Sequence, residues 1–457
     1  MHSTSERGLW GSRFAFILAA AGSAVGLGNI WRFPYVTGQN GGAAFVILYL
    51  VFVVAIGAPV MIAEISVGRA TGRNPVGALK QLAPRSLWYL VGVLGVVTGI
   101  GILSYYSVVA GWTFGYFVKT VFGAFASSGF TSAQSAQIFN DFVANPLAAV
   151  FYLFVFLFLT ALVVMGGVSG GIERSVKLMM PVLLTLLLLL TVRSLTLPGA
   201  GAGLSFYLKP DFSKMTAGVV AMALGQALFS LSLGMGAMIT YGSYLHKKEN
   251  IVISGLYVCF FDTLIAVVAG FLIFPALFAM GVDPAQGPGL VFVVLPTIFP
   301  KMIFGSLFGA LFFLLLTIAA LTSTISLLEV AVAYLVDEKK WRRRPAVLLM
   351  TALAFVLGVP SALSLGAVRG LTELPLVHMG FLDLMNIAVG NYSLTIGALL
   401  ISVFAGYKWG VAALRREIEA EGAVFFYRRF WTFLIRFICP VAIFVIFVYI
   451  LLTKKYF

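Results

Sequence analysis

Apolar segments long enough to cross a lipid bilayer follow one another along almost the whole chain. A helix needs about 20 apolar residues to cross the hydrocarbon core. We place eleven such segments at residues 13–37, 43–68, 88–121, 146–167, 173–194, 216–245, 250–281, 305–336, 345–363, 381–407 and 427–452. With 61% hydrophobic and 10% charged residues, the chain is expected to be an all-α polytopic membrane protein.

Basic residues are distributed unevenly between the loops that join these segments. If the N-terminus lies inside the cell, twenty of the 30 lysines and arginines fall on the cytoplasmic side and eight outside. Because Lys and Arg accumulate in cytoplasmic loops, we expect a multi-pass protein of the cell membrane with a cytoplasmic N-terminus and an external C-terminus. The net charge of +14 then faces anionic lipid of the bilayer, and no nucleic-acid partner is expected.

Two other classes of protein share parts of this pattern. A basic N-terminus and an alanine run before Gly22 are also typical of a cleaved signal peptide, but here the apolar segment continues into Asn29 and Arg32. A membrane haem enzyme would need paired histidines within the bilayer. The three histidines lie in loops or at segment ends: His2, His246 and His378. We therefore expect a protein that is not an enzyme.

Two of the apolar segments are interrupted by small and polar residues. The first contains GSAVGLGNIWRFP from Gly22 to Pro34, and the sixth contains GQALFSLSLGMGAMITYGSY from Gly225 to Tyr244. In hydrocarbon such an interruption persists only where the freed backbone groups line a cavity or hold a ligand. Interruptions at matching positions of two halves are typical of secondary transporters with inverted repeats and a site at the membrane midplane.

Half-helix ends carry partial charges of opposite sign, so a carboxylate and a cation would both find a binding partner between two broken helices.

We expect three parts of the chain: a first repeat at 1–203 with helices 1–5, a second at 204–407 with helices 6–10, and a C-terminal part at 408–457. This last part holds a polar stretch, 408–429, whose alternating acids and bases predict a cytoplasmic amphipathic helix, followed by helix 11.

Together with AALTSTISLLE from Ala319 to Glu329, both interruptions resemble the motifs of the neurotransmitter:sodium symporter family, in its bacterial amino-acid transporter branch. The resemblance extends from Arg7 to the last segment. It implies an inverted 5+5 helix repeat with discontinuous first and sixth helices, plus one extra C-terminal helix. It also implies sodium-coupled uptake of amino acids by alternating access.

By this resemblance the protein binds two sodium ions through hard oxygen ligands, which suit a hard cation. The first ion would meet the carbonyl of Ala24 and the side chains of Asn29, Ser230 and Asp262. The second would meet the carbonyls of Gly22, Val25 and Ala319 and the hydroxyls of Thr322 and Ser323. Alternatively, these hydroxyls have no role in cation binding and only donate hydrogen bonds to carbonyls of the preceding turn or to a neighbouring helix.

Asp262 lies in the middle of the apolar stretch CFFDTLIAVVAGF. Placing an acid inside the membrane costs free energy, so such a residue indicates a functional site. Family members usually carry Asn there, and chloride-dependent members offset the sodium charges with a bound anion. The carboxylate could supply that charge permanently, so we expect transport without chloride. A neutral, protonated Asp262 is the alternative. Glu64 and Glu329 are expected to pair with backbone groups or to line the inward water path.

The resemblance places the substrate between the two interruptions. Its carboxylate would lie near the amides of Gly26 to Gly28 and the hydroxyl of Tyr106. Its ammonium would meet carbonyls around Ala24, Phe229 and Ser232. Further residues expected around the substrate are Ser23, Ile102, Ser230, Met235, Ser323, Ser326 and Leu327. No acid in this apolar set faces a side-chain cation, so a neutral hydrophobic or aromatic L-amino acid is predicted.

Two gates are implied as well. The outer gate would combine Arg32, Tyr106 and Phe229 with Asp383, because Asn386 occupies the usual position of the gate acid. The inner latch would pair Arg7 with Asp337, and Trp10 and Tyr244 would pack around it.

A substrate sensor, a channel, or a symporter for another small amino acid or amine could use the same fold. No oligomeric state is predicted.

Overall fold

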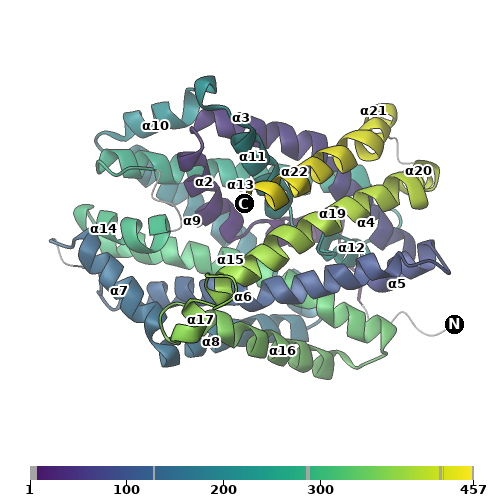
Figure 1. Ribbon diagram of the computed structural model, residues 1–457, viewed down its shortest axis with the longest axis horizontal. Helices are drawn as coiled ribbons and strands as arrows, with labels where there is room; N and C mark the ends of the chain where they lie inside the picture. The colour runs from purple at the N-terminus through teal and green to yellow at the C-terminus, as the bar shows by residue number, and fades with distance from the viewer. Residues whose placement is uncertain (1–7, 127–128, 285–288, 421–424, 426, 455–457) are drawn as a thin grey trace.

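The computed structural model describes residues 8–126, 129–284, 289–420, 425 and 427–454, and in these ranges the chain is a bundle of helices without a strand (Figure 1). Nine helices in this part of the chain are long and apolar enough to cross a membrane. A tenth is the bent pair Arg13–Ala24 and Gly28–Gln39. The predicted sixth segment consists of two shorter helices that do not pass this test.

The helices of the predicted segments begin and end close to the expected residues. They are α1 (Arg13–Ala24), η2 (Gly28–Arg32) with α2 (Phe33–Gln39), α3 (Ala43–Phe52) with α4 (Ala58–Thr71), α6 (Tyr89–Val121), α8 (Pro146–Met165), α9 (Arg174–Leu195), α11 (Ala217–Ser230) and α12 (Ala237–Gly242), α13 (Ile251–Ala279), α15 (Gly305–Glu338), α16 (Arg343–Leu363), α18 (Phe381–Met385) with η8 (Asn386–Ser393), α19 (Leu394–Val403) and η9 (Phe404–Lys408), and α21 (Arg428–Phe433) with η11 (Leu434–Ile438) and α22 (Cys439–Thr453).

Local sequence signals explain several helix starts. The side chain of Asn145 accepts a hydrogen bond from the Ala148 amide, and Pro146 occupies the first helical position of α8. Asn250 caps α13 in the same way through the Ile253 amide. A capping side chain satisfies an amide that the helix leaves unpaired, and proline lacks the amide that would be unpaired there.

Shorter helices lie at the two ends of the bundle. At one end, on the right of Figure 1, are α5 (Pro75–Leu82), α20 (Val411–Ile418) and α21. We call this the basic end, because these helices carry Lys80, Arg415, Arg416, Arg428 and Arg429. At the opposite end are α7 (Ser132–Ala144), α10 (Ala200–Leu208) and α14 (Leu295–Ile298). The amphipathic helix predicted at 408–429 is shorter than expected, because in the described residues only α20 is helical between Gly410 and Arg428.

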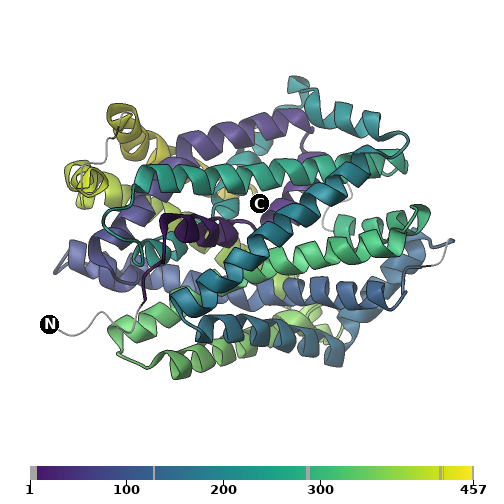
Figure 2. The ribbon, with the colours of Figure 1, turned by 180° about the vertical axis from the view of Figure 1, so that it is seen from behind.

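The longest helices, α6 and α15, have 33 and 34 residues and make the most extensive contact between any two elements of the described residues. Seen from behind, α1 lies beside α13 and α9 (Figure 2). Both broken segments, α1–α2 and α11–α12, contact α15, the first through α1 and the second through α12. The two breaks are thereby held in the interior of the bundle. Cys259 and Cys439 are buried and form no disulfide with each other.

Candidate functional site

The first break follows α1. Helix α1 ends at Ala24, Val25 is extended, and the chain resumes as a helix at Gly28 after a bend of 53°. A Cβ atom on Gly26 would lie 2.5 Å from Oγ of Ser323 and 2.7 Å from the hydroxyl of Tyr106. Only glycine fits this close approach without displacing those two side chains. The next amide, of Leu27, donates a hydrogen bond of 2.9 Å to the Tyr106 hydroxyl.

The second break separates α11 from α12. Gly234 and Gly236 have positive φ angles of 86° and 76°, which glycine adopts without strain. The freed amide of Gly234 donates a 2.7 Å hydrogen bond to Oε1 of Glu64, a fully buried residue of α4. The expectation that Glu64 pairs with a backbone group is therefore confirmed. Its carboxylate stabilises the unwound segment by satisfying a donor that the helix has released.

Asn29 connects the two breaks. Its Oδ1 accepts from the Gly26 amide at 3.0 Å, and its Nδ2 donates to Oγ of Ser230 at 3.0 Å and to Oδ1 of Asp262 at 2.7 Å. The Ser230 hydroxyl donates to Oδ2 of Asp262 at 2.8 Å, and the hydroxyl of Tyr49 lies 3.3 Å from the same oxygen. Three of the four residues expected around the first cation are thus in direct contact.

The residues expected around the second cation also converge. The Thr322 hydroxyl lies 3.3 Å from the carbonyl oxygen of Val25 and 2.9 Å from that of Ala319. The Ser323 hydroxyl lies 3.2 Å and 3.5 Å from the same two oxygens. A Cβ atom on Gly22 would touch the Thr322 side chain at 3.5 Å. The break therefore presents carbonyl oxygens to the hydroxyl face of α15, an oxygen-rich environment for a hard cation.

A cavity lies between the two breaks, α6 and α15. All thirteen residues expected around a substrate line it: Ser23, Ala24, Gly26, Gly28, Ile102, Tyr106, Phe229, Ser230, Ser232, Met235, Ser323, Ser326 and Leu327. The Ser232 hydroxyl donates to the Ser23 carbonyl at 3.2 Å, which joins the two breaks a second time. The lining is mostly apolar and contains no Asp, Glu, His, Lys or Arg, so the cavity favours an apolar side chain on a ligand.

A larger cavity of about 300 Å³ adjoins this one. Tyr106 and Phe229 line both cavities and therefore lie between them. The guanidinium of Arg32 lies over the Phe229 ring, 4.6 Å from its centre. Asp383 and Asn386 line the same larger cavity. The structure thus places all the residues expected at the outer gate around one vestibule.

Aromatic side chains pack together around the end of α12. The indole of Trp10 donates to the Tyr241 carbonyl at 3.0 Å, and its ring packs edge-on against Tyr241 and Tyr244. The Tyr244 hydroxyl donates to Oε1 of fully buried Glu329 at 2.7 Å. Both oxygens of Glu329 accept from the guanidinium of Arg343, at 3.1 Å and 2.5 Å. Glu329 is thus in a buried ion pair.

Asp337, the acid expected in the inner latch, lies at the same end. Its Oδ2 accepts from the backbone amide and the side-chain amide of Asn74, at 2.8 Å and 3.1 Å. Its expected partner Arg7 lies outside the described residues.

Sequence reasoning missed three contributors to this site. Tyr49 contacts Asp262, Gln226 donates to the Gly28 carbonyl at 2.9 Å, and Arg343 pairs with Glu329. Gln226 offered a signal, since it is a fully buried amide inside the second interruption. Tyr49 and Arg343 offered none, because tyrosine at an apolar segment and arginine at its end are ordinary in membrane helices.

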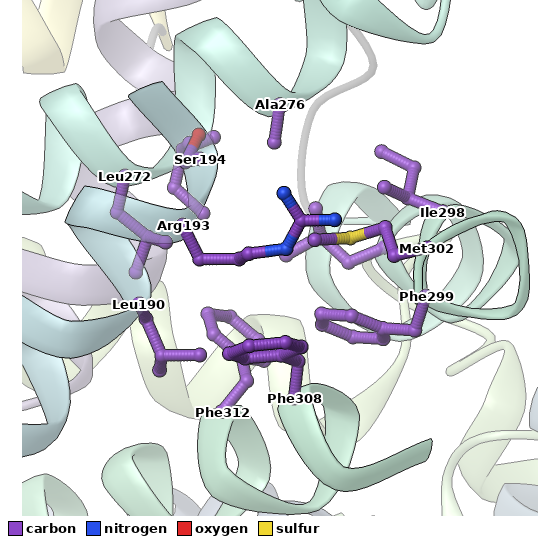
Figure 3. A pocket seen from close by; sticks show the side chains of 12 residues that line it. Leu190, Arg193, Ser194, Leu272, Ala276, Ile298, Phe299, Met302, Phe308 and Phe312 are labelled. Atoms are coloured by element: carbon purple, nitrogen blue, oxygen red, sulfur yellow. The ribbon is translucent and has the colours of Figure 1, made fainter. Parts of the chain in front are cut away.

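A separate cavity lies between α9, α13, α14 and α15, and the guanidinium of Arg193 points into it among apolar side chains (Figure 3). Arg193 also lies over the ring of Phe308, 5.6 Å from its centre. None of the residues predicted to bind sodium or substrate lines this cavity. We therefore do not include it in the candidate site.

The model of the sodium:neurotransmitter symporter family matches residues 7–128 and 135–456. The chain belongs to this family. It is a family of transporters, so the expectation that the chain is not an enzyme is confirmed. An uncharacterized sodium-dependent transporter of Bacillus subtilis, YhdH, is 41% identical over 96% of both chains. A similar protein of Haemophilus influenzae is 36% identical over 98% of both chains.

A solved structure confirms the fold. The crystal structure of MhsT in complex with L-phenylalanine matches 97% of this chain and 99% of its own, with a TM-score of 0.89 and 43% identity. More distant is the human sodium- and chloride-dependent taurine transporter, 30% identical over 78% of this chain and 65% of its own. The chain is therefore a sodium-dependent, multi-pass membrane transporter of this family.

Proposed function

We propose that this transporter is a symporter that couples sodium to the uptake of neutral hydrophobic or aromatic L-amino acids. The observation that carries the proposal is the cavity between the two helix breaks. Its walls offer freed backbone groups for a substrate carboxylate and ammonium and apolar side chains for the rest of the molecule. MhsT, with 43% identity, was crystallised with L-phenylalanine, which supports an amino acid of this class.

Two sodium ions are proposed to bind beside this cavity. The first would sit among Ala24, Asn29, Ser230 and Asp262, and the second among Gly22, Val25, Ala319, Thr322 and Ser323. The close approach of these oxygens in the present structure supports the proposal, since the hydroxyls can turn their lone pairs toward a cation without a large rearrangement. Each sodium would draw the α1 break toward α13 or α15, which links sodium binding to the shape of the substrate cavity.

Chloride independence is proposed from the charge of Asp262. This carboxylate is fully buried and accepts hydrogen bonds from Asn29 and Ser230. Each of its two oxygens has a hydrogen-bond donor, so the negative charge that the proposal requires would be partnered. A fixed negative charge next to the first cation would offset the sodium charges, as a bound anion does in chloride-dependent relatives.

Alternating access is the proposed mechanism. Two features support it: Trp10 packs against Tyr241 and Tyr244 around the end of α12, and Tyr106 and Phe229 line both the substrate cavity and the vestibule. Substrate and sodium would enter through the vestibule, and the broken helices would then rock against the helices around them. We also propose that 1–203 and 204–407 are the two inverted repeats and that 408–457 is an addition to them.

Uptake into proteoliposomes tests the function. The purified protein would be reconstituted, and uptake of labelled L-phenylalanine and L-leucine measured with an inward sodium gradient, with potassium in place of sodium, and with gluconate in place of chloride. We expect accumulation above the external concentration that requires sodium and is unchanged by gluconate. Sodium-dependent binding without accumulation would instead indicate a sensor. Sodium-driven uptake of glycine or an amine alone would contradict the substrate class.

A further inference from the structure

A cluster of exposed basic residues lies where the last two membrane segments meet at the basic end. It consists of Lys408 at the end of η9, Arg428 and Arg429 at the start of α21, and Arg436 in η11. All four side chains belong to exposed residues. None of them forms a salt bridge with an acid of the described residues, so within that part of the chain four positive charges face outward without a counter-charge.

Two acids of the neighbouring helix α20 are already paired. Glu417 of α20 accepts from Arg69 at 2.8 Å and lies 3.1 Å from Nζ of Lys247. Glu419 lies 3.9 Å from the guanidinium of Arg415. These two acids are therefore engaged with other cations and not with the cluster.

Exposed aromatic and apolar side chains surround this cluster. Phe430, Phe433 and Phe437 are 59%, 50% and 50% exposed, and exposed Val441 and Phe444 continue the same side of α22. In a membrane helix such a surface faces lipid tails. The basic cluster thus lies at the edge of a lipid-facing surface.

Arg436 shows how deep the cluster reaches. It follows Arg428 by eight residues, so at 1.5 Å per residue its Cα lies roughly 12 Å further into the membrane segment. Its guanidinium lies over the ring of Tyr407, 5.3 Å from the centre, and the Tyr407 hydroxyl donates to the Arg436 carbonyl at 2.7 Å. A charge at this depth is unfavourable unless it reaches the interface or meets an anion.

We propose that this cluster binds the headgroup of an anionic phospholipid. The phosphate would lie between Arg428, Arg429 and Arg436, whose guanidinium groups suit its oxygens. The acyl chains would lie along Phe433, Phe437 and α22. Phosphatidylglycerol, which has a net negative charge, would bind in preference to zwitterionic phosphatidylethanolamine, because basic pockets between membrane helices favour anionic headgroups.

Native mass spectrometry of the full-length protein tests this proposal. The protein would be released from membranes containing equal amounts of phosphatidylglycerol and phosphatidylethanolamine, and the retained lipid counted. The test variant is R428Q/R429Q, and the matched control is R342Q/R344Q, which removes two exposed arginines at the start of α16 at the same end. R436Q is measured alone as a second test variant.

We expect the wild type and the control to retain phosphatidylglycerol over phosphatidylethanolamine, and R428Q/R429Q to lose about tenfold in that preference. R436Q should lose part of the preference for phosphatidylglycerol. Equal losses in R342Q/R344Q and R428Q/R429Q would overturn the proposal, because the effect would then be one of net charge. Displacement of the lipid by millimolar inorganic phosphate would also overturn it, since the site would then recognise a free anion.

Discussion

Asn29 and Asp262 show how a few buried polar residues replace the backbone pairing that a broken helix loses. Asn29 accepts from the freed Gly26 amide with one end of its side chain and donates to Ser230 and Asp262 with the other. The same three side chains that satisfy the break also surround the proposed first sodium. A buried polar network of this kind is favourable only when each member is satisfied.

Replacing Asp262 with Asn tests the role of its charge. A unit charge about 5 Å from a cation contributes a few kcal/mol at an effective dielectric constant of about 20. We expect D262N to need on the order of tenfold to a hundredfold more sodium for half-maximal uptake and to become stimulated by chloride. D211N removes an exposed acid and serves as the control. Unchanged sodium affinity and continued chloride independence in D262N would mean that Asp262 is neutral.

Adding a methyl group at Gly26 tests the close approach at the first break. In G26A the new Cβ would lie within 2.7 Å of both Ser323 Oγ and the Tyr106 hydroxyl. Overpacking costs about 1–3 kcal/mol, so we expect sodium-dependent substrate binding to fall about tenfold or more. Scintillation proximity binding would measure it. G201A, whose Cβ would meet nothing within 4 Å, should bind normally. Normal binding by G26A would show that the break tolerates a side chain.

Among the elements, α20 is joined to the bundle by hydrogen bonds from the side chain of Arg69. The Glu417 carboxylate accepts from Nε of Arg69, and the Glu417 carbonyl accepts from Nη2 of the same guanidinium. Nη1 of Arg69 reaches the Glu249 carbonyl, so one fully buried side chain joins α4, α20 and the loop before α13. Leu414 and Ile418 provide the apolar contact of α20.

We therefore expect E417A to loosen α20. Removing one member of a buried ion pair costs about 3–5 kcal/mol, because the other charge stays buried. Hydrogen exchange measured by mass spectrometry should become faster at 411–418 in this variant. The matched control is E419A, whose partly exposed pair with Arg415 is worth at most about 1 kcal/mol. Equal exchange in the two variants would show that the apolar contacts alone hold α20.

At the scale of the whole molecule, the distribution of charge along the bundle predicts its orientation in the membrane. The basic end carries α5, α20 and α21, and the opposite end carries α7, α10 and α14 (Figure 1). Since Lys and Arg are retained on the cytoplasmic side during insertion, the basic end should face the cytoplasm. The vestibule would then open to the outside, as uptake requires.

Labelling of introduced cysteines tests this orientation. Lys340 follows α15 near the basic end, and Ser213 follows α10 at the opposite end; both are exposed. A membrane-impermeant thiol reagent added to intact cells should label S213C but leave K340C unlabelled until the membrane is opened. The native Cys259 and Cys439 are buried and give little background. The reverse pattern of labelling would reverse the proposed direction of the vestibule.

The sequence by itself determined the membrane helices, the two breaks and the family. These features depend on local properties, namely the length of an apolar run and the presence of glycine where a helix must open. The family resemblance also predicted the residues that line the central cavity, because their positions follow the family motifs.

Only the tertiary structure decided which distant side chains meet. Tyr49 reaches Asp262 across 213 positions, and Arg69 reaches Glu417 across 348. Such pairs depend on how each helix is rotated and packed against its neighbours, and an apolar run constrains neither. For the same reason the ion pair of Glu329 with Arg343 and the basic cluster around Arg436 became visible only when the helices were in place.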